Sequence, residues 1–586
     1  MKRYLSLLAL LLITLLMITA CGGDPSTNAD PALTTEPVPE TDPVPATLDI
    51  VQNGVANYTI IRGEKANSET VSAATMLFKA FNEHMGIIPE FTTDWIKPGS
   101  SYDSTSLEIL VGDTGYSESA EALKDLPYGD YIIKPVGNKL VINAWSTSAV
   151  DDAVHAFTEE MIKSATQGNF SIPADYCKTG TVIQLANALP AYGNTGPSVV
   201  YHAGDDNQLL IFEETTEAAY NDYRKALENA GYTLYTDNKI TDNTFATYIN
   251  DDYVVNAGYY RYQDSVRVII EPRKNLPGLA ADNKYTAKVT PSFAMLGVEF
   301  PEGDGSLSQN GLCFIYQLAD GSYIIIDGGF NRDTDAQNIY KYMHEHAPDK
   351  NNITVAAWIF THAHGDHNGA FFKFSPNYGS KVNVELVIGN FPSDETREAG
   401  GLGTEGSGGA KIMNYTKEYH KNAKFIKAHV GQKFFLRDAE IEILYTLESY
   451  SPGVLDYFNT SSLIFTVKIA GQQFLILGDA SNIACTVAHS MYGSYLKSDI
   501  IHVAHHGYTT GSSSYKGVTD VYDDASAPVV FWPVGNQDFP GMSSRAYDAH
   551  LQKLASTKEI IVAGSRQVRI MLPYTYGTSG YETILK

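Results

Sequence analysis

Residues 359–370 read IFTHAHGDHNGA and place three histidines and an aspartate within six positions. They continue the apolar run VAAWIF (355–360), which predicts a buried strand that ends at this polar cluster. Burying four such groups without partners would be costly, so solvent, one another or a metal ion must satisfy them. The chain must therefore adopt a fold that brings partners to the end of this strand.

The residue types of the cluster suit a metal ion. His362 and His364 are two residues apart and share one face of an extended segment. We expect Asp366 and His367 to follow in a loop, from which both can turn inward. Neutral imidazole and carboxylate are ligands for zinc, and also for manganese or iron. Four such groups make parts of two metal sites, which need further ligands from elsewhere.

Two later segments supply candidates for those further ligands. Asp479 ends the apolar run FLILG, and His505 follows IIHVA. Both side chains arrive at strand ends, so both can reach one rim of a sheet. The alternative is a set of surface histidines near a turn. Potential ligands at the ends of several successive strands argue against this alternative.

The region from about 289 to 586 alternates strand-like and helix-like patterns. It contains hairpins at 312–327, 432–445 and 462–479, a helix at 333–348 and further strands that end in polar residues. Strands with helices between them predict a layered α/β domain.

The motifs of this region resemble those of a known superfamily. THAHGDH (361–367) matches the HxHxDH motif of the metallo-β-lactamase fold, whose members are mostly binuclear metal hydrolases. IIIDGG (324–329) resembles its early strand-end aspartate, and LILGDA (475–480) resembles its bridging-aspartate strand. VAHHGYTTGSS (503–513) resembles the HHG segment of the branch with ComEC-type DNA-uptake proteins and choline-phosphate esterases of teichoic acid. The resemblance spans nearly all of 290–586 and implies an αββα sandwich.

The resemblance also implies a role for each matching residue. The implied metal ligands are His362 and His364 for a first ion, Asp366, His367 and His505 for a second, and Asp479 between them. Asp366 and Asp479 would also orient the attacking hydroxide. Asp327 would support the ligands by hydrogen bonding. His506 is expected to contact substrate, because neighbouring side chains on a strand point in opposite directions.

One departure from the family pattern concerns the first ion. The family commonly has another histidine between the first motif and the bridging aspartate, but only His420 and His429 occur there, and neither fits. Asn459, in YFNTSSLIF, lies near the expected place and is a candidate for metal or substrate contact. His429 remains an outside candidate for the metal. The departure argues against a classical antibiotic-hydrolysing β-lactamase.

The implied activity is hydrolysis. Two divalent ions lower the pKa of a bridging water, so a hydroxide can attack phosphorus or a carbonyl carbon. We expect a phosphodiesterase that acts on cell-wall phosphocholine or teichoic-acid polymers, or on nucleic acid. The alternatives are a lactone or amide hydrolase of the same fold, and a surface carbohydrate-binding protein whose metal domain is inactive.

No organic cofactor is expected. The glycine-rich segment 399–410, AGGLGTEGSGGA, lacks the GK[ST] ending of a phosphate-binding loop. It is interpreted either as a mobile cover over the site or as an exposed connection.

The first 48 residues predict a lipid-anchored exterior protein. Lys2 and Arg3 precede an apolar stretch that ends in ITAC (18–21), which resembles a bacterial lipobox with Cys21 as the lipidated residue. A short transmembrane anchor is the alternative. Residues 22–48 are rich in Pro, Thr, Asp and Glu and predict an extended tether. We therefore expect attachment to the outer face of the cytoplasmic membrane.

Two smaller domains are expected before the metal domain. Residues 49–180 predict an α/β accessory domain that resembles the N-terminal domain of glycoside hydrolases such as α-glucuronidases. Residues 181–288 predict a small α+β domain without catalytic residues. The net charge of −25 disfavours nucleic acid as a partner, because phosphate contacts need Lys and Arg. Cys177, Cys313 and Cys485 are interpreted as small buried hydrophobes.

Overall fold

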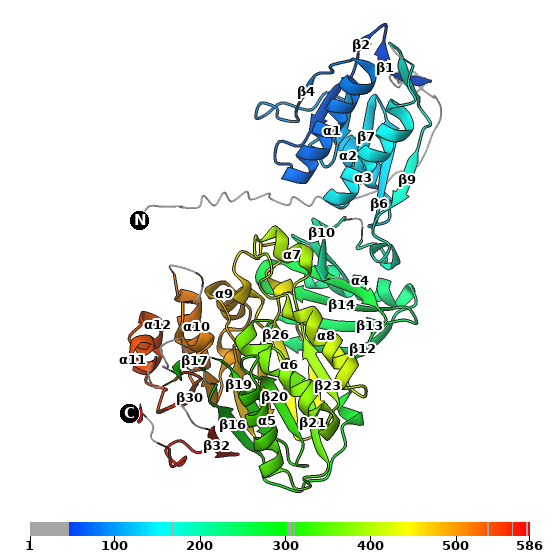
Figure 1. Ribbon diagram of the computed structural model, residues 1–586. Helices are drawn as coiled ribbons and strands as arrows, with labels where there is room; N and C mark the ends of the chain where they lie inside the picture. Colours follow the sequence, from blue (N-terminus) through cyan, green and yellow to red (C-terminus); the bar gives the residue numbers. More distant parts are fainter. Residues whose placement is uncertain are drawn as a thin grey trace, which may run out of the picture. The chain divides into compact units, whose positions relative to one another are not determined.

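Sheets follow one another along the chain (Figure 1). The computed structural model describes residues 46–586 apart from 167, 194, 205–206, 299, 302–306, 309–310, 510, 512–513, 536–537, 565–566, 582–583 and 586. The expected signal peptide and nearly all of the expected tether lie outside these residues. Strand β1 (Thr47–Gln52) begins within the last two residues of the segment expected to be a tether.

The first region holds a six-stranded sheet of order β4-β3-β5-β7-β6-β9 and a smaller sheet, β2-β1-β8. The strands are β2 (Val55–Ala56), β3 (Thr59–Arg62), β4 (Phe91–Thr93), β5 (Glu108–Val111), β6 (Asp130–Val136), β7 (Lys139–Ala144), β8 (Phe170–Pro173) and β9 (Lys178–Thr181). The helices are α1 (Ser68–Met85), α2 (Ser117–Leu123) and α3 (Thr147–Phe157). Helix α1 ends at Gly86, as its sequence predicts, because this glycine adopts the left-handed conformation at φ 70°.

The second region is one antiparallel sheet with a single long helix packed on it. The order is β10 (Val199–Gly204), β11 (Asn207–Phe212), β15 (Ser265–Pro272), β14 (Tyr253–Tyr260), β13 (Asn243–Ile249) and β12 (Thr233–Ile240). Helix α4 (Glu217–Asn229) buries Tyr220, Tyr223 and Leu227 against the sheet. This is the helix-on-sheet arrangement that the sequence predicts.

The third region holds two eight-stranded sheets. The first contains β24 (Lys424–Lys427), β23 (Leu386–Gly389), β21 (Ile353–Ile359), β20 (Tyr323–Asp327), β19 (Cys313–Gln317), β16 (Ser292–Leu296) and β32 (Gln567–Met571), with β22 (Val382–Val384) beside β21. The second contains β25 (Lys433–Leu436), β26 (Ala439–Tyr445), β27 (Ile464–Ile469), β28 (Gln472–Ile476), β29 (Ile500–His502), β30 (Val529–Trp532), β31 (Glu559–Val562) and β33 (Ile584–Leu585).

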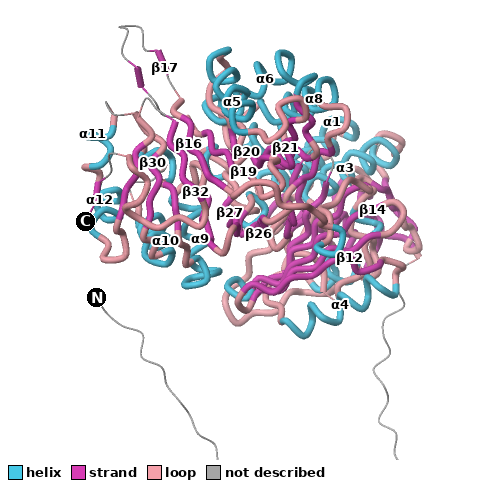
Figure 2. Tube along the Cα trace, turned by 90° about the horizontal axis from the view of Figure 1, so that it is seen from below, coloured by secondary structure: helices cyan, strands magenta, loops and turns pink. Residues whose placement is uncertain are grey.

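The two sheets face each other across a shared apolar core. Phe293 of the first sheet contacts Phe474 and Phe531 of the second, with ring centroids 5.1 and 4.8 Å apart. The helices on the first sheet are α5 (Asp333–His346), α6 (Gly365–Tyr378) and α8 (Gly408–Tyr419), and those on the second are α9 (Asn482–Tyr492), α10 (Lys516–Ala525) and α12 (Ala546–Lys553) (Figure 2). The layers are therefore helix, sheet, sheet and helix.

Two parallel strand pairs carry the polar residues to one edge. Strands β20 and β21 run parallel in the first sheet, and β28 and β29 run parallel in the second. The polar segments that contain Asp327, 361–367, Asp479 and 505–506 lie at or just beyond the carboxyl ends of these strands. Strand β29 is shorter than the sequence predicts, because it ends at His502.

Two further expectations concern cysteines and membranes. Cys313 and Cys485 are buried as expected, but Cys177 is exposed, which corrects its interpretation as a buried residue. None of the helices within residues 46–586, as far as these are described, has the length and apolarity needed to cross a bilayer.

Candidate metal centre

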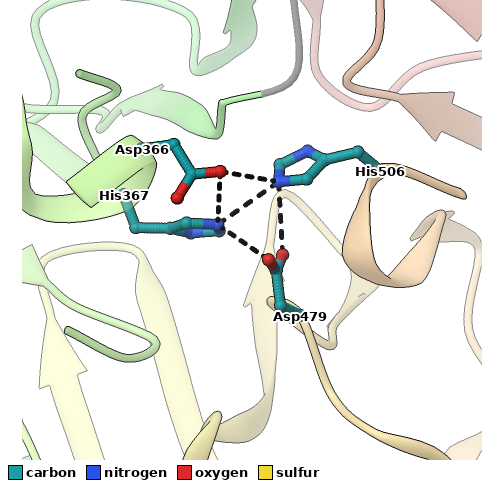
Figure 3. A group of neighbouring side chains, drawn as sticks. All are labelled: Asp366, His367, Asp479 and His506. Carbon is teal, nitrogen blue, oxygen red and sulfur yellow. Dashed lines mark hydrogen bonds and ion pairs between the residues drawn. The ribbon is translucent and has the colours of Figure 1, made fainter. Parts of the chain in front are cut away.

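Two groups of side chains share Asp479 at the rim of the two sheets. One consists of Asp366, His367, Asp479 and His506, and the other of His362, His364 and Asp479 (Figure 3 shows the first). Within each group, one potential ligand atom per residue lies within 4.8 Å of all the others. These are the residues of the HxHxDH motif, joined by residues about 110 and 140 positions further along.

The motif spans the junction between β21 and α6. His364 caps the helix, which begins at Gly365, so Asp366 and His367 lie in its first turn. The expectation that Asp366 and His367 lie in a loop was wrong, because the loop after β21 ends at His364 and both residues belong to the helix. The carboxylate of Asp366 suits this place, since a helix N-terminus favours negative charge.

Asp327 fixes the ring of His367. Its Oδ2 accepts a hydrogen bond from Nδ1 of His367 at 2.7 Å, and it also accepts from the Thr361 hydroxyl at 2.7 Å. Its backbone has a φ of 56°, an unfavourable conformation for a residue with a side chain, and such strain is common at functional sites. Because the proton on Nδ1 points at Asp327, the lone pair on Nε2 points into the cluster.

The ring nitrogens of His367 and His506 converge on the carboxylate of Asp479. His367 Nε2 lies 3.1 Å from Oδ2 of Asp479, and His506 Nε2 lies 3.3 Å from Oδ1. The two Nε2 atoms are 3.3 Å apart, and Asp366 Oδ2 lies 3.9 and 3.7 Å from them. Lone pairs and carboxylate oxygens that crowd together in this way need a positive charge between them.

The pKa values reflect this demand for positive charge. Burial alone would raise the pKa of Asp479, but the imidazoles of His367, His506 and His505 hold it well below its ordinary value. Burial would lower the pKa of His367, yet the carboxylates of Asp479 and Asp327 outweigh burial and raise that pKa well above its ordinary value. Burial lowers the pKa of His506 and favours its neutral form, which is the form that binds metals.

The second group also fits a cation. Burial lowers the pKa of His362 well below its ordinary value, so its ring is neutral. Its Nε2 is buried without a hydrogen-bond partner among the described residues and lies 3.8 Å from Oδ2 of Asp479. A buried lone pair without a donor is costly, and a cation between imidazole and carboxylate would satisfy it.

The structure places His506, and not the expected His505, in a group of potential ligands. Nδ1 of His506 donates to the carbonyl of Pro533 at 3.1 Å, which leaves Nε2 free to face the cluster. Nδ1 of His505 donates to the carbonyl of Thr509, and its Nε2 accepts from Nδ2 of Asn459 at 3.2 Å. Both nitrogens of His505 are therefore engaged, although Nε2 lies 3.7 Å from Oδ2 of Asp479.

The physical reason for this difference is the backbone after β29. His505 and His506 both have positive φ, 49° and 53°, in a tight turn at 504–507. Strand alternation, on which the sequence-based choice rested, does not apply in such a turn. His506 is thus placed with the ligand group and His505 beside it, while the roles of all these residues as ligands stay predictions.

Asn459 and the two remaining histidines are also placed. Asn459 lies beside His505 and the hydroxyl of Tyr457, and its Oδ1 is buried without a partner among the described residues. His429 lies between Glu271 and Glu448, outside both ligand groups. His420 contacts the hydroxyl of Ser375. Neither histidine therefore replaces the missing ligand.

One contact of the site was not predicted from the sequence. Oε1 of Glu405, in the glycine-rich segment, lies 2.9 Å from Nε2 of His364. A single glutamate 41 residues away along the chain carries no signal of such a contact.

Comparison with known proteins gives one sequence match. Residues 309–514 match the family model of the metallo-beta-lactamase superfamily, a range that contains every member of both ligand groups. A search of curated proteins found no match.

Several solved structures resemble part of the chain. The metallo-beta-lactamase fold protein YhfI from Bacillus subtilis is 12% identical, covers 48% of this chain and 100% of its own, and gives a TM-score of 0.31. A diphosphatase from the PhnP family is 11% identical over 50% of this chain and 100% of its own, with a TM-score of 0.29. CmlA, a diiron β-hydroxylase from Streptomyces venezuelae, is 12% identical over 48% of this chain and 54% of its own, with a TM-score of 0.29. At TM-scores this low, the structural likeness adds nothing to the sequence match.

The sequence match and the side-chain cluster point to the same part of the chain. Residues 309–514, in the C-terminal half of the chain, form a metallo-β-lactamase superfamily domain. The buried histidine–aspartate cluster marks this domain as a metal-dependent hydrolase.

Proposed function

We propose that the protein holds two divalent metal ions, most readily zinc, with manganese or iron as alternatives, and hydrolyses phosphodiesters. The observation that carries the proposal is the pair of ligand groups that share Asp479. Oδ2 of Asp479 lies 3.1 Å from Nε2 of His367 in one group and 3.8 Å from Nε2 of His362 in the other, so this carboxylate can serve both ions of a two-metal site. Bound as a pair, such ions acidify a water and neutralise charge on the phosphate oxygens.

The histidines and aspartates of the cluster have different roles toward water. The buried rings of His362, His367 and His506 exclude water from one side of the site. Asp366 is 24% exposed at the side chain, so its carboxylate can accept a hydrogen bond from the attacking water and hold it in place. Asp479, which is 2% exposed, holds the same water from the buried side.

Three hydrogen-bonded side chains beside the cluster, Tyr457, Asn459 and His505, form the side assigned to substrate binding. The hydroxyl of Tyr457 contacts His505, and Asn459 contacts both. The side chain of His505 is 18% exposed, which lets it reach a substrate group in front of the cluster. We therefore assign substrate contact to Asn459 and His505, in place of the expected Asn459 and His506.

Phosphodiesters are preferred over lactones and amides for two reasons. The HHG segment resembles that of the branch with DNA-uptake proteins and choline-phosphate esterases. Two-metal sites also suit in-line displacement at phosphorus, since one ion steadies the attacking oxygen and the other the leaving oxygen. Phosphocholine esters of a cell-wall polymer are preferred to nucleic acid as the substrate, because the choline ammonium offsets the phosphate charge, whereas the net charge of −25 repels a dense polyanion.

The test compares substrate classes on the purified protein. Bis(p-nitrophenyl) phosphate, a lactone and a chromogenic β-lactam are offered to the native, chelator-treated and metal-restored protein. We expect turnover of the phosphodiester, abolished by chelator and restored by zinc or manganese. The His364→Ala variant should lose activity by several orders of magnitude, because metal ligands act as a unit.

A matched variant separates the metal site from general damage. His84→Ala removes an exposed histidine from α1 in another region and should keep full activity. Turnover of the lactone alone, or phosphodiester turnover that survives metal removal, would contradict the proposal. Metal binding with no turnover of any class would instead support the binding-protein alternative.

We also propose that the protein is held at the outer face of the cytoplasmic membrane by a lipid on Cys21, near cell-wall polymers. The support is the signal-peptide pattern that ends in ITAC. In cells fed a labelled fatty acid, the wild-type chain and Cys177→Ser, which alters an exposed cysteine, should carry label. Cys21→Ser should carry none, and equal labelling of Cys21→Ser would rule the anchor out.

A further inference from the structure

The glycine-rich segment 399–410, which joins α7 (Asp394–Ala399) to the first turn of α8, packs closely against residues around His364. A Cβ atom on Gly406 would lie 1.9 Å from the ring of Phe458, and one on Gly408 would lie 2.5 Å from Nδ2 of Asn368. The ring of Phe458 in turn contacts that of His364, with centroids 4.8 Å apart. The glycines therefore let the backbone approach the residues that surround His364.

A buried arginine, Arg397, holds the backbone of the same segment by hydrogen bonds. Arg397 is 7% exposed, and its Nη1 donates to the carbonyl of Gly403 at 2.5 Å and to that of Glu405 at 3.4 Å. The guanidinium also pairs with Asp394. The amide of Leu402 donates to the carbonyl of Arg397 at 3.0 Å, so the chain folds back over the arginine. These contacts fix the backbone from which the Glu405 side chain leaves.

Glu405 reaches from this backbone to the outer nitrogen of His364. The distance from Oε1 to Nε2 is 2.9 Å, typical of a hydrogen bond between imidazole and carboxylate. A proton on Nε2 that donates to Glu405 leaves the lone pair on Nδ1. Glu405 thus does for His364 what Asp327 does for His367, but on the opposite nitrogen of the ring.

We propose that Glu405 is a positioning residue that holds His364 in the tautomer and orientation needed to bind the first metal ion. This inference rests on the proposed function, since it assumes that His362, His364 and Asp479 hold an ion. Among the described residues, that group offers three potential ligands where the other offers four. The orientation and basicity of each ligand therefore matter more in this group than in its neighbour.

The experiment measures metal content and affinity rather than turnover. Wild-type protein, Glu405→Ala, Glu405→Gln and the control Glu398→Ala are equilibrated with zinc against a chromophoric chelator, and bound zinc per chain is determined. Glu398→Ala removes an equal charge from an exposed residue of the neighbouring helix α7. Circular dichroism verifies that each variant is folded.

We expect Glu405→Ala to weaken one of two zinc ions by about 10- to 100-fold and leave the other unchanged, because supporting partners of metal ligands have effects of this size. Glu405→Gln keeps an oxygen acceptor for Nε2 and should recover part of the loss. Glu398→Ala should match the wild type.

The remaining outcomes overturn either the inference or the function beneath it. Two zinc ions of unchanged affinity in Glu405→Ala, or equal weakening of both, would overturn the positioning role and leave the proposed function standing. A folded Glu405→Gln that is weaker than Glu405→Ala would also overturn it. A wild-type protein that binds no zinc would remove the proposed function, and the inference with it.

Discussion

At the scale of single residues, the partner of one ring nitrogen decides what the other nitrogen can do. Nδ1 of His367 donates a hydrogen bond to Asp327, and Nδ1 of His506 donates one to the carbonyl of Pro533. In both rings, Nε2 therefore faces Asp479. His505 has both nitrogens engaged, by Asn459 and by the carbonyl of Thr509. The three histidines therefore differ in whether each has a nitrogen available to bind metal.

Replacing His505 and His506 one at a time tests this distinction. We expect His506→Ala to lose one of two zinc ions per chain, since it removes a nitrogen 3.3 Å from Asp479. His505→Ala should keep both ions and mainly raise KM, because its ring lies at the substrate side. Bound zinc determined by elemental analysis, together with steady-state kinetics, checks both variants. Loss of an ion from His505→Ala with none from His506→Ala would restore the sequence-based assignment.

The sequence predicted the places of residues that lie at strand ends, while their roles stay predictions. Asp327 is the last residue of β20, and Asp479 follows β28 by three residues, as the apolar runs before them predict. The expected strand through His505 and His506 was wrong, because the chain forms a turn there with two residues of positive φ. Two adjacent histidines give no warning of such a turn.

At the scale of elements, the segment between α7 and α8 is shaped by its glycines. The sequence suggested a mobile cover or an exposed connection, and could not show that Arg397 and Phe458 hold it against His364. The contact with Phe458 joins residues 52 positions apart, and those of Arg397 depend on how the intervening chain folds back, so local composition cannot reveal them. The layered arrangement of the third region was predictable, because its apolar strands alternate with amphipathic helices along the chain.

Two glycines of this segment with the same φ of 71° make a matched pair. Gly406→Ala would push a methyl into the ring of Phe458, whereas Gly401→Ala meets no atom within 4 Å. Both variants have the same unfavourable backbone conformation, so their difference isolates the steric clash. We expect Gly406→Ala to be less stable than Gly401→Ala by about 1–3 kcal/mol, as overpacked sites are, and to bind zinc more weakly. Equal unfolding midpoints in denaturant would contradict this packing.

At the scale of the whole molecule, a buried charge network joins the second region to the third. His429, after β24, lies 3.6 Å from Glu271 of β15 and 3.3 Å from Glu448. Burial would lower the pKa of His429, but the carboxylates of Glu448 and Glu271 raise it to about 9. Burial would likewise raise the pKa of Glu448, but His429 holds it at about 2.

This network predicts how stability changes with pH. The pKa of His429 is raised on folding, so its contribution is full below pH 6.5 and is lost as pH rises through about 9. The pKa of Glu448 is lowered, so its contribution is full above pH 4.5 and is lost as pH falls toward 2. We expect His429→Gln to lower the free energy of unfolding by about 3–5 kcal/mol near pH 6, as the loss of a partner from a buried ion pair does. The fall in this free energy between pH 7 and 10 should also become less steep in the variant.

His420→Gln is the control for this pH series. Burial lowers the pKa of His420 from its ordinary 6.5 to about 4, so its own effect on stability is confined to pH values below about 7.5, and its replacement should leave the decline above that pH unchanged. Denaturant midpoints measured at several pH values give both curves. A His429→Gln protein that still declines like the wild type above pH 7 would show that the network is not the source.

The central claim is that two metal ions lie side by side and share Asp479. Anomalous diffraction at the zinc absorption edge, from crystals grown with excess zinc, tests it most directly. The account predicts two peaks about 3.5–4 Å apart, one among His362, His364 and Asp479 and the other among Asp366, His367, Asp479 and His506. A cluster with no peak, or with one ion that does not touch Asp479, would contradict it.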